Sequence, residues 1–244
     1  MRFQRVLCKF IVVLFLLMIS TISWADIIED NFNDNTLDTE LWTSDGEYPN
    51  RWAYERSGRL EIAIDGTEDD GAAVMCNTFI PINQDFGVQV DFNSSECSEN
   101  SIIGLMIANA TTDIEHGDEY IMIANGHDDN YTTTRSWMAR KAIDDIFTET
   151  EIQPTSSTSG TFYIEKSGST FYVSLTGYGT ENALASFTIN DWTSCNQLIV
   201  RLFAWSGYQV LSGQGSYFDN FKLDYYPSSP IKAMPWIPLL LLDD

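Results

Sequence analysis

Between Asp26 and Tyr226 the chain alternates apolar and polar residues in short runs, a period of two that is typical of β-strands with one buried face. No stretch has the spacing of three or four residues between apolar positions that marks an amphipathic helix. The runs that predict strands are Arg59–Asp65, Ala72–Ile80, Phe86–Asn93, Ile102–Asn109, Glu119–Asn125, Arg135–Lys141, Thr161–Lys166, Thr170–Thr176, Leu184–Ile189, Gln197–Trp205 and Ser216–Tyr225. Turn pairs such as Asp70-Gly71 and Asn125-Gly126 separate several of them.

Two of these runs predict a β-hairpin, because Thr161–Lys166 and Thr170–Thr176 flank the short polar segment Ser167-Gly168-Ser169. About 11–13 strands without helices predict an all-β fold of two packed antiparallel sheets, a β-sandwich or jelly roll. No repeat of fixed length occurs, which disfavours a propeller or a solenoid. A length of 244 residues accommodates one such sandwich, which we expect over residues 26–226.

The two ends of the chain depart from this pattern. Arg2, Arg5 and Lys9, then an apolar run over Phe10–Ile19 and small residues before Asp26, predict a signal peptide over residues 1–25. We therefore expect an exported protein that is periplasmic, secreted or at the cell surface. Residues 227–244 begin with a Pro- and Ser-rich break and continue as an apolar stretch interrupted by proline. This tail either serves sorting, docking or membrane contact, or packs on the domain as a strand or coil.

The charge of the chain excludes one large class of partners. It contains 35 Asp and Glu against 13 Lys and Arg, a formal net charge of −22. The expected leader holds three of the basic residues, so its removal leaves 10 basic against 35 acidic residues, or −25. Such a surface repels phosphate backbones, which argues against nucleic-acid binding. It attracts cations, and Ca²⁺ suits oxygen-rich sites.

Three cysteines remain after removal of the leader, and export would permit a disulfide between two of them. Cys97 and Cys195 lie in polar, loop-like stretches, whereas Cys76 lies in an apolar run. Of the three possible pairings we therefore expect Cys97 with Cys195, and Cys76 as a buried thiol. The sequence contains no C-x-x-C spacing, so a cluster of cysteines around a metal ion is not expected.

One short motif occurs twice, as Asp30-Asn31-Phe32 near the start and Asp219-Asn220-Phe221 near the end. In each copy the Phe follows the Asp by two residues, which places the two side chains on one face of a strand. If the terminal strands run side by side, Asp30 and Asp219 approach each other, and a cation between them would relieve their repulsion. We expect a structural Ca²⁺ there, with Glu29 as a further ligand.

Four segments, in order along the chain, resemble concanavalin A-like lectin/glucanase (LamG-like) jelly-roll domains. They are residues 30–38 with Leu41-Trp42, Gly58–Ile62, the hairpin Tyr163–Thr170, and Phe218–Leu223. The resemblance implies two large curved antiparallel sheets and, in many members, a structural Ca²⁺ near the chain termini. It leaves the activity open, because this fold hosts lectins, hydrolases, lyases and adhesive modules.

Laminarinase-type members of this superfamily carry a Glu-x-Asp-x-(x)-Glu strand, whose outer carboxylates serve as nucleophile and general acid. The nearest stretch in this chain runs from Glu115 to Glu119. On a strand it would place Glu115 and Glu119 on one face and Asp118 on the other, so the constellation fails. We therefore assign no catalytic residue. The two histidines, His116 and His127, belong to no metalloprotease motif.

Aromatic residues in polar surroundings are the best candidates for ligand contact, because sugars stack on aromatic rings and bind polar groups through their hydroxyls. Trp137 lies in Arg135-Ser136-Trp137, and Tyr131 follows a polar loop. We expect Trp137, Tyr131 and Arg135 to contact ligand. Arg135, Trp137 and Lys141 share one strand face, which also leaves room for lyase chemistry.

The sequence thus predicts an exported, non-catalytic β-sandwich that binds a carbohydrate or a cell-surface partner and holds a structural Ca²⁺. Two alternatives stay open. One is a polysaccharide-active glycoside hydrolase or lyase of the same fold, and the other is a structural protein of the cell surface or matrix. We expect no nucleic acid as partner, and membrane contact only through residues 231–242.

Overall fold

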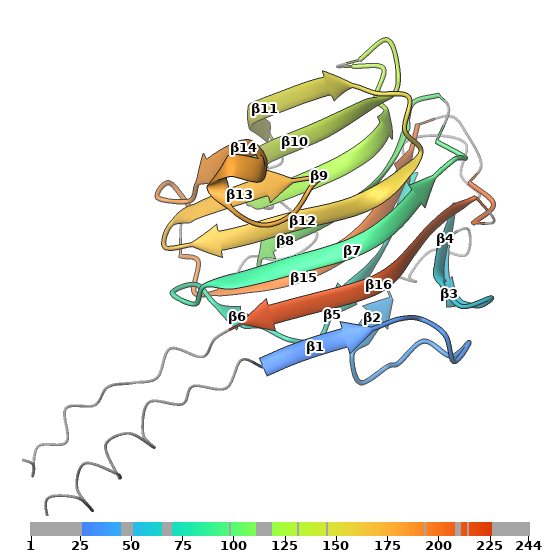
Figure 1. Ribbon diagram of the computed structural model, residues 1–244, viewed down its shortest axis with the longest axis horizontal. Helices are drawn as coiled ribbons and strands as arrows, with labels where there is room; N and C mark the ends of the chain where they lie inside the picture. The colour runs from blue at the N-terminus through green and yellow to red at the C-terminus, as the bar shows by residue number, and fades with distance from the viewer. Residues whose placement is uncertain are drawn as a thin grey trace, which may run out of the picture. The chain divides into compact units, whose positions relative to one another are not determined.

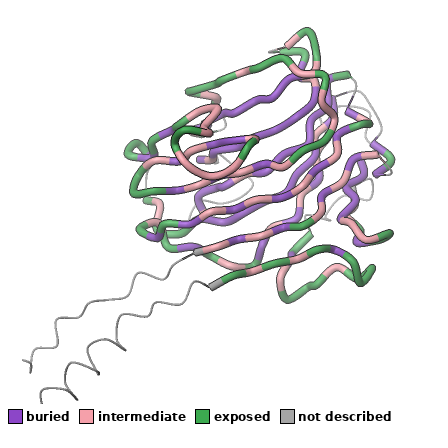
Figure 2. The backbone as a smooth tube through the Cα atoms, viewed as in Figure 1, coloured by how far each residue is buried: buried purple, intermediate pink, exposed green. Residues whose placement is uncertain are grey.

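Alternating burial organises the strands of this protein. In β7 (Phe86–Ser94), side chains at even positions are buried and those at odd positions are half-buried. The same alternation recurs along neighbouring strands, where buried and half-buried residues follow each other (Figure 2). Since successive side chains of a strand point to opposite faces, each strand contributes one apolar row to a common core.

The computed structural model describes residues 26–225 apart from 45–50, 65–69, 98, 111–118, 131, 145, 193, 208–210 and 214. The expected leader, the expected tail, Tyr131 and the stretch from Glu115 to Asp118 lie outside the described residues. Ile27–Asp224 form one compact unit. Within the described ranges, no helix is long and apolar enough to cross a membrane.

The strands form two antiparallel sheets of eight strands each (Figure 1). Sheet A has the order β14-β13-β12-β7-β16-β4-β3 with β1 paired to β16, and sheet B the order β11-β10-β9-β8-β15-β5-β2 with β6 paired to β15. Besides β7, their bounds are β1 Asp26–Asp30, β2 Trp42–Ser44, β3 Arg51–Glu55, β4 Leu60–Ile64, β5 Asp70–Cys76, β6 Ile80–Pro81, β8 Ser101–Asn109, β9 Tyr120–His127, β10 Ser136–Ile143, β11 Ile146–Pro154, β12 Ser159–Ser167, β13 Thr170–Ser174, β14 Ala183–Thr188, β15 Gln197–Ser206 and β16 Ser216–Tyr225.

The predicted all-β sandwich is confirmed, and each of the eleven predicted strands is present within a few residues of its expected ends. The predicted hairpin is β12–β13, in which Ser167 pairs with Thr170. Sequence reasoning missed β1, β2, β3, β6 and β11. Most of these are short or polar; β11, an edge strand, is mostly exposed, so its sequence lacks an alternating apolar row. The one described helix is a single 3-10 turn over Thr180–Asn182.

The core lies between the inner faces of the two sheets. Phe92 of β7 stacks on Phe162 of β12 with ring centroids 3.9 Å apart. Trp137 of β10 crosses from the opposite sheet and meets Phe92 edge-on at 5.4 Å. Burial of such large rings removes much apolar surface from water and is the main stabilising contribution in a sandwich of this kind.

Trp42 of sheet B connects that sheet to β1 and β16 of sheet A. It belongs to β2 of sheet B, is 1% exposed, and packs against Phe32 at 5.7 Å and against Phe221 of β16 at 4.8 Å. Its indole N–H donates a hydrogen bond of 2.8 Å to Asp30 Oδ2. Asp30 Oδ1 accepts a second bond of 2.8 Å from the backbone N–H of Phe32. The end of β1 is therefore fixed by one carboxylate and three aromatic rings.

Replacement of Asp30 by alanine should lower the free energy of unfolding by about 2–4 kcal/mol, because two hydrogen bonds to a charged acceptor are lost and the indole N–H is left buried. Urea denaturation measures this loss. Glu29→Ala, which removes a neighbouring exposed carboxylate, is the control and should change stability by less than about 0.5 kcal/mol.

The same measurement in Ca²⁺ and in chelator separates this anchoring role from metal binding. We expect the Asp30→Ala loss to be equal in both solutions. A wild-type melting temperature that falls in chelator, with no such fall in Asp30→Ala, would instead make Asp30 a calcium ligand.

Candidate functional site

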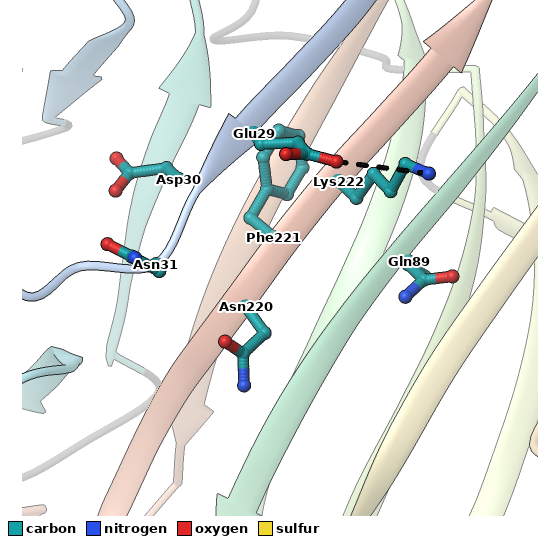
Figure 3. Close-up of a pocket in the computed structure, with 7 residues that line it drawn as sticks. All are labelled: Glu29, Asp30, Asn31, Gln89, Asn220, Phe221 and Lys222. Carbon is teal, nitrogen blue, oxygen red and sulfur yellow. Dashed lines mark ion pairs between the residues drawn. The ribbon is translucent and has the colours of Figure 1, made fainter.

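Strands β1, β16 and β7 run side by side in sheet A (Figure 1). A polar pocket opens there on the outer face of the sheet (Figure 3). Its volume is about 570 Å³. The lining residues are Glu29, Asp30, Asn31, Gln89, Asn220, Phe221 and Lys222. Both copies of the Asp-Asn-Phe motif contribute to it, since each supplies its Asn and the first also supplies its Asp.

The backbone explains why both motifs reach the pocket. Neither copy is a regular strand, because Phe32 has φ 48° and Asn220 has φ 50°, both in the left-handed region. These turns let Phe32 and Phe221 point inward to Trp42 while Asn31 and Asn220 stay exposed. The prediction that Asp and Phe share one extended face is therefore wrong in its geometry, although the terminal strands do pair and both motifs line one pocket.

The predicted calcium ligands do not form a ligand set. Both oxygens of Asp30 already accept hydrogen bonds, and Glu29 Oε1 lies 3.9 Å from the ammonium of Lys222. Asp219 accepts from the backbone N–H of Asn220 at 2.7 Å. Burial raises the pKa of Asp219, and the charge of Asp91 adds to the effect against that hydrogen bond.

The distribution of metal-binding side chains over the rest of the fold leads to the same result. In the described part of the chain, no three His, Cys, Asp or Glu residues are grouped so as to hold a metal ion. Calcium binding therefore stays a prediction from the sequence, and Glu29, Asp30 and Asp219 as arranged do not fit the ion.

The outer face of sheet B is the second candidate site, and pairing across its strands defines its rows. Register places Met75, Arg201, Met106, Met122 and Arg140 in one row. The next row holds Ala73, Phe203, Gly104, Ala124 and Met138. The described strands thus carry four methionines, two arginines and a phenylalanine on these two rows of one face.

Large side chains on this outer face pack against one another and so bury part of it. Ile102, Met122, Ala124, Met138 and Phe203 form a buried cluster. A Cβ on Gly104 would lie 2.6 Å from two ring carbons of Phe203, so the absence of a side chain at Gly104 makes room for that ring. Tyr120, Phe147 and Trp205 pack against the cluster and remain partly exposed. The face is therefore a floor of apolar side chains and two buried arginines, with three partly exposed aromatic rings.

Arg140, a buried charged residue on this face, contacts an acid, a methionine and an aromatic ring. It is 1% exposed, its Nη1 donates to Asp128 Oδ2 at 2.8 Å, and its guanidinium lies 4.5 Å from the ring centre of Phe147. Met138 Sδ accepts a further contact from Arg140 Nη2 at 3.3 Å. The arginine thereby fixes Phe147 of the edge strand over the sheet.

The outward-facing positions of the described strands of sheet B hold no Asp or Glu. Asp128 follows the end of β9 and is engaged by Arg140. Glu119, the last residue of the acidic stretch that begins at Glu115, is 2% exposed and accepts from Asn109 Nδ2 at 2.8 Å. Glu149 and Lys141 pair on the other side of the sheet, 3.1 Å apart.

Two of the residues predicted to contact ligand, Trp137 and Arg135, are engaged within the protein, the first by burial and the second by hydrogen bonds. Trp137 is 9% exposed and lies in the aromatic core between the sheets. Arg135 Nη1 donates to Ser94 Oγ at 2.8 Å and to Asn125 Oδ1 at 2.9 Å, and its Nη2 donates to the Cys97 carbonyl. Trp137 therefore supports packing and Arg135 joins the two sheets. Tyr131 lies outside the described residues.

The strand face considered for lyase chemistry is interior as well. Lys141 is 1% exposed and donates to Asp191 at 2.8 Å and to Glu149 at 3.1 Å. These ion pairs raise the pKa of Lys141 although its burial opposes them. Because Trp137 and Lys141 point between the sheets, they offer no open surface to a polysaccharide.

The predicted Cys97–Cys195 disulfide is absent, and Cys76, Cys97 and Cys195 are all free. Cys97 comes just before the start of β8, whereas Cys195 comes just before Gln197, next to the end of β8, since Leu198 pairs with Asn109. A strand of this length spans roughly 30 Å, and a disulfide tolerates no more than about 7 Å between Cα atoms. The expected burial of Cys76 is correct.

The free thiols should react slowly. Burial raises the pKa of both Cys97 and Cys195 to about 11, and the negative charge of Glu119 contributes at Cys195. We expect Cys195, the more accessible of the two, to be alkylated by iodoacetamide at pH 8 at least tenfold more slowly in the folded protein than in urea. Peptide mass spectrometry measures this rate for each cysteine, and a Cys97–Cys195 bridged peptide would contradict the structure.

No protein-family model matches this sequence, and no curated protein is significantly similar to it. Solved structures are similar in three dimensions. SCLam, a non-specific endo-β-1,3(4)-glucanase from family GH16, has a TM-score of 0.54 at 10% identity, over 83% of this chain and 91% of its own. LamA from Zobellia galactanivorans, in complex with laminaritriose and laminaritetraose, gives 0.52 at 11% identity, over 82% and 97%.

A third neighbour is described as an immunostimulatory antigen and pseudo β-1,3-glucanase of Mycobacterium tuberculosis. It has a TM-score of 0.52 at 12% identity, over 82% of this chain and 97% of its own. At such identities the similarity concerns the fold and not the activity. The chain therefore has the concanavalin A-like lectin/glucanase fold of the GH16 glucanases.

Proposed function

We propose that this protein binds a β-glucan on the outer face of sheet B and does not cleave it. The observation that carries the proposal is the pairing of three partly exposed aromatic rings, Tyr120, Phe147 and Trp205, with an apolar floor that has no outward-facing carboxylate on its described strands. β-glucan is the ligand class of choice because structural neighbours include a protein in complex with laminaritriose and laminaritetraose.

Aromatic rings suit this task because the C–H faces of pyranose rings pack on their π-faces. Trp205 of β15 and Tyr120 of β9 lie on the same face as the buried methionines. Phe147 of β11 is held by Arg140. A rigid ring loses little conformational freedom on binding, so each stacked sugar adds affinity at small entropic cost.

Hydrolysis by the known carboxylate mechanisms needs two acidic side chains on either side of the glycosidic bond, about 5 Å apart for retention and about 6.5–9.5 Å for inversion. The described strands of sheet B offer no such pair on the outer face. Asp128, at the end of β9, is bound to Arg140 at 2.8 Å. This is the physical reason for proposing binding without cleavage.

Hydrolysis is the second candidate function, and the comparisons favour it. SCLam is described as a glucanase, and the neighbour in complex with laminari-oligosaccharides has the same fold. The neighbour described as a pseudo-glucanase supports the first candidate. Export, and a role at the cell surface or in the matrix, stay predictions from the sequence.

Affinity electrophoresis in gels containing laminarin or lichenan tests binding. The wild-type protein should be retarded, and Trp205→Ala should weaken binding about tenfold, equivalent to about 1.4 kcal/mol. Tyr54→Ala is the matched control, since Tyr54 is an exposed aromatic residue (46%) on β3 of the other sheet, and it should bind as the wild type does.

A reducing-end assay on the same two glucans tests the absence of cleavage. We expect no release of reducing sugar during prolonged incubation. Release by the wild type that is lost in Asp128→Asn would decide for the hydrolase. In the electrophoresis experiment, equal retardation of the wild type and of Trp205→Ala would refute binding at the outer face of sheet B.

A further inference from the structure

We propose that the pocket between β1, β16 and β7 is a second glycan-binding site, on the outer face of sheet A. The inference rests on the proposed function for the class of ligand, a neutral polysaccharide, and on the pocket's own residues for the location. A volume of about 570 Å³ is within the range of small-ligand sites.

The lining of the pocket offers hydrogen bonds that the protein does not use. Among the described residues, the side-chain amides of Asn31 and Gln89 have no hydrogen-bond partner, so each presents a donor and an acceptor. Asn220 donates through Nδ2 to Asp91 at 2.9 Å, which leaves its carbonyl oxygen as an acceptor. Figure 3 shows these three amides spread around the opening, on three different segments of the chain.

Such an arrangement matches a sugar ring. Neighbouring hydroxyls of a pyranose each donate and accept, and planar amides can satisfy both roles at once. The pocket has one aromatic lining residue, Phe221, but it is 1% exposed and packs on Trp42. Binding would therefore depend on hydrogen bonds at this site, in contrast to the stacking proposed for sheet B.

The charges of the pocket favour a neutral ligand. Glu29 and Lys222 face each other across it at 3.9 Å, and Lys222 also contacts Asp224 at 3.0 Å (Figure 3). The one cation of the lining is thus matched by carboxylates. A chain with a formal charge of −22 adds a repulsive field for anions. An uncharged glycan meets neither obstacle.

The two sites face away from each other. Gln89 and Lys222 belong to the outer face of sheet A, and Trp205 and Tyr120 to the outer face of sheet B. Packed sheets are about 10 Å apart, and their side chains fill the space between them. One short stretch of glycan cannot occupy both sites, so a single molecule can hold two polysaccharide chains and crosslink them.

Isothermal titration calorimetry with laminaritetraose tests the inference. We expect two oligosaccharides per wild-type chain, and one per chain for the double variant Asn31→Ala/Gln89→Ala. Trp205→Ala should retain the site on sheet A. Gln153→Ala is the control for loss of an exposed amide outside the pocket, and it should still bind two. Turbidity of laminarin solutions should rise with wild type and not with either site variant.

The outcomes separate the two proposals. One equivalent for the wild type, abolished by Trp205→Ala and unchanged in the double variant, would refute the pocket and leave the proposed function standing. No binding by the wild type would refute both. Should the double variant fail to fold, Asn31→Ala alone, an exposed residue, serves in its place. Unchanged stoichiometry in that folded variant, with unchanged affinities, would count against the pocket.

Discussion

The hydrogen bond between the indole of Trp42 and the carboxylate of Asp30 is the constraint from which much of this structure follows. It joins the end of β1, a short strand that pairs with β16 of sheet A, to β2 of sheet B. It also requires Phe32 and Phe221 to turn inward around the indole. Because the Phe residues point inward, the Asn residues beside them point outward and form two sides of the pocket. A core contact and a surface feature thus share one cause.

The outer faces of the two sheets differ because different kinds of side chain point away from the core on each sheet. On sheet B the outward positions carry Met122, Met138 and Phe203, which bury one another on the open side of the sheet. On sheet A the outward positions carry amides and charged groups, such as Gln89 and Lys222. Apolar floors favour stacking of sugar rings, and polar pockets favour hydrogen bonding to hydroxyls. One fold can therefore present two kinds of sugar contact.

Period-two patterning was sufficient to predict the fold, because burial on one face imposes it directly on residues such as Val88 and Val90. It was insufficient for the sites. Trp137 has polar neighbours in sequence, yet it points into the core, since a polar context does not reveal which face a strand buries. Met106, Met122 and Met138 occupy outward positions on three neighbouring strands, a signal that becomes visible only when the register is known. The left-handed backbone at Phe32 likewise has no mark in the sequence, since a bulky side chain seldom adopts that conformation.

The separation of the cysteines has a consequence for what stabilises the sandwich. Cys97 and Cys195 lie beside opposite ends of β8, and burial holds both as neutral thiols. Stability then comes from packed rings and ion pairs such as that between Lys141 and Asp191, none of which needs an oxidant. The packing of the described sandwich therefore depends on no covalent link between its strands.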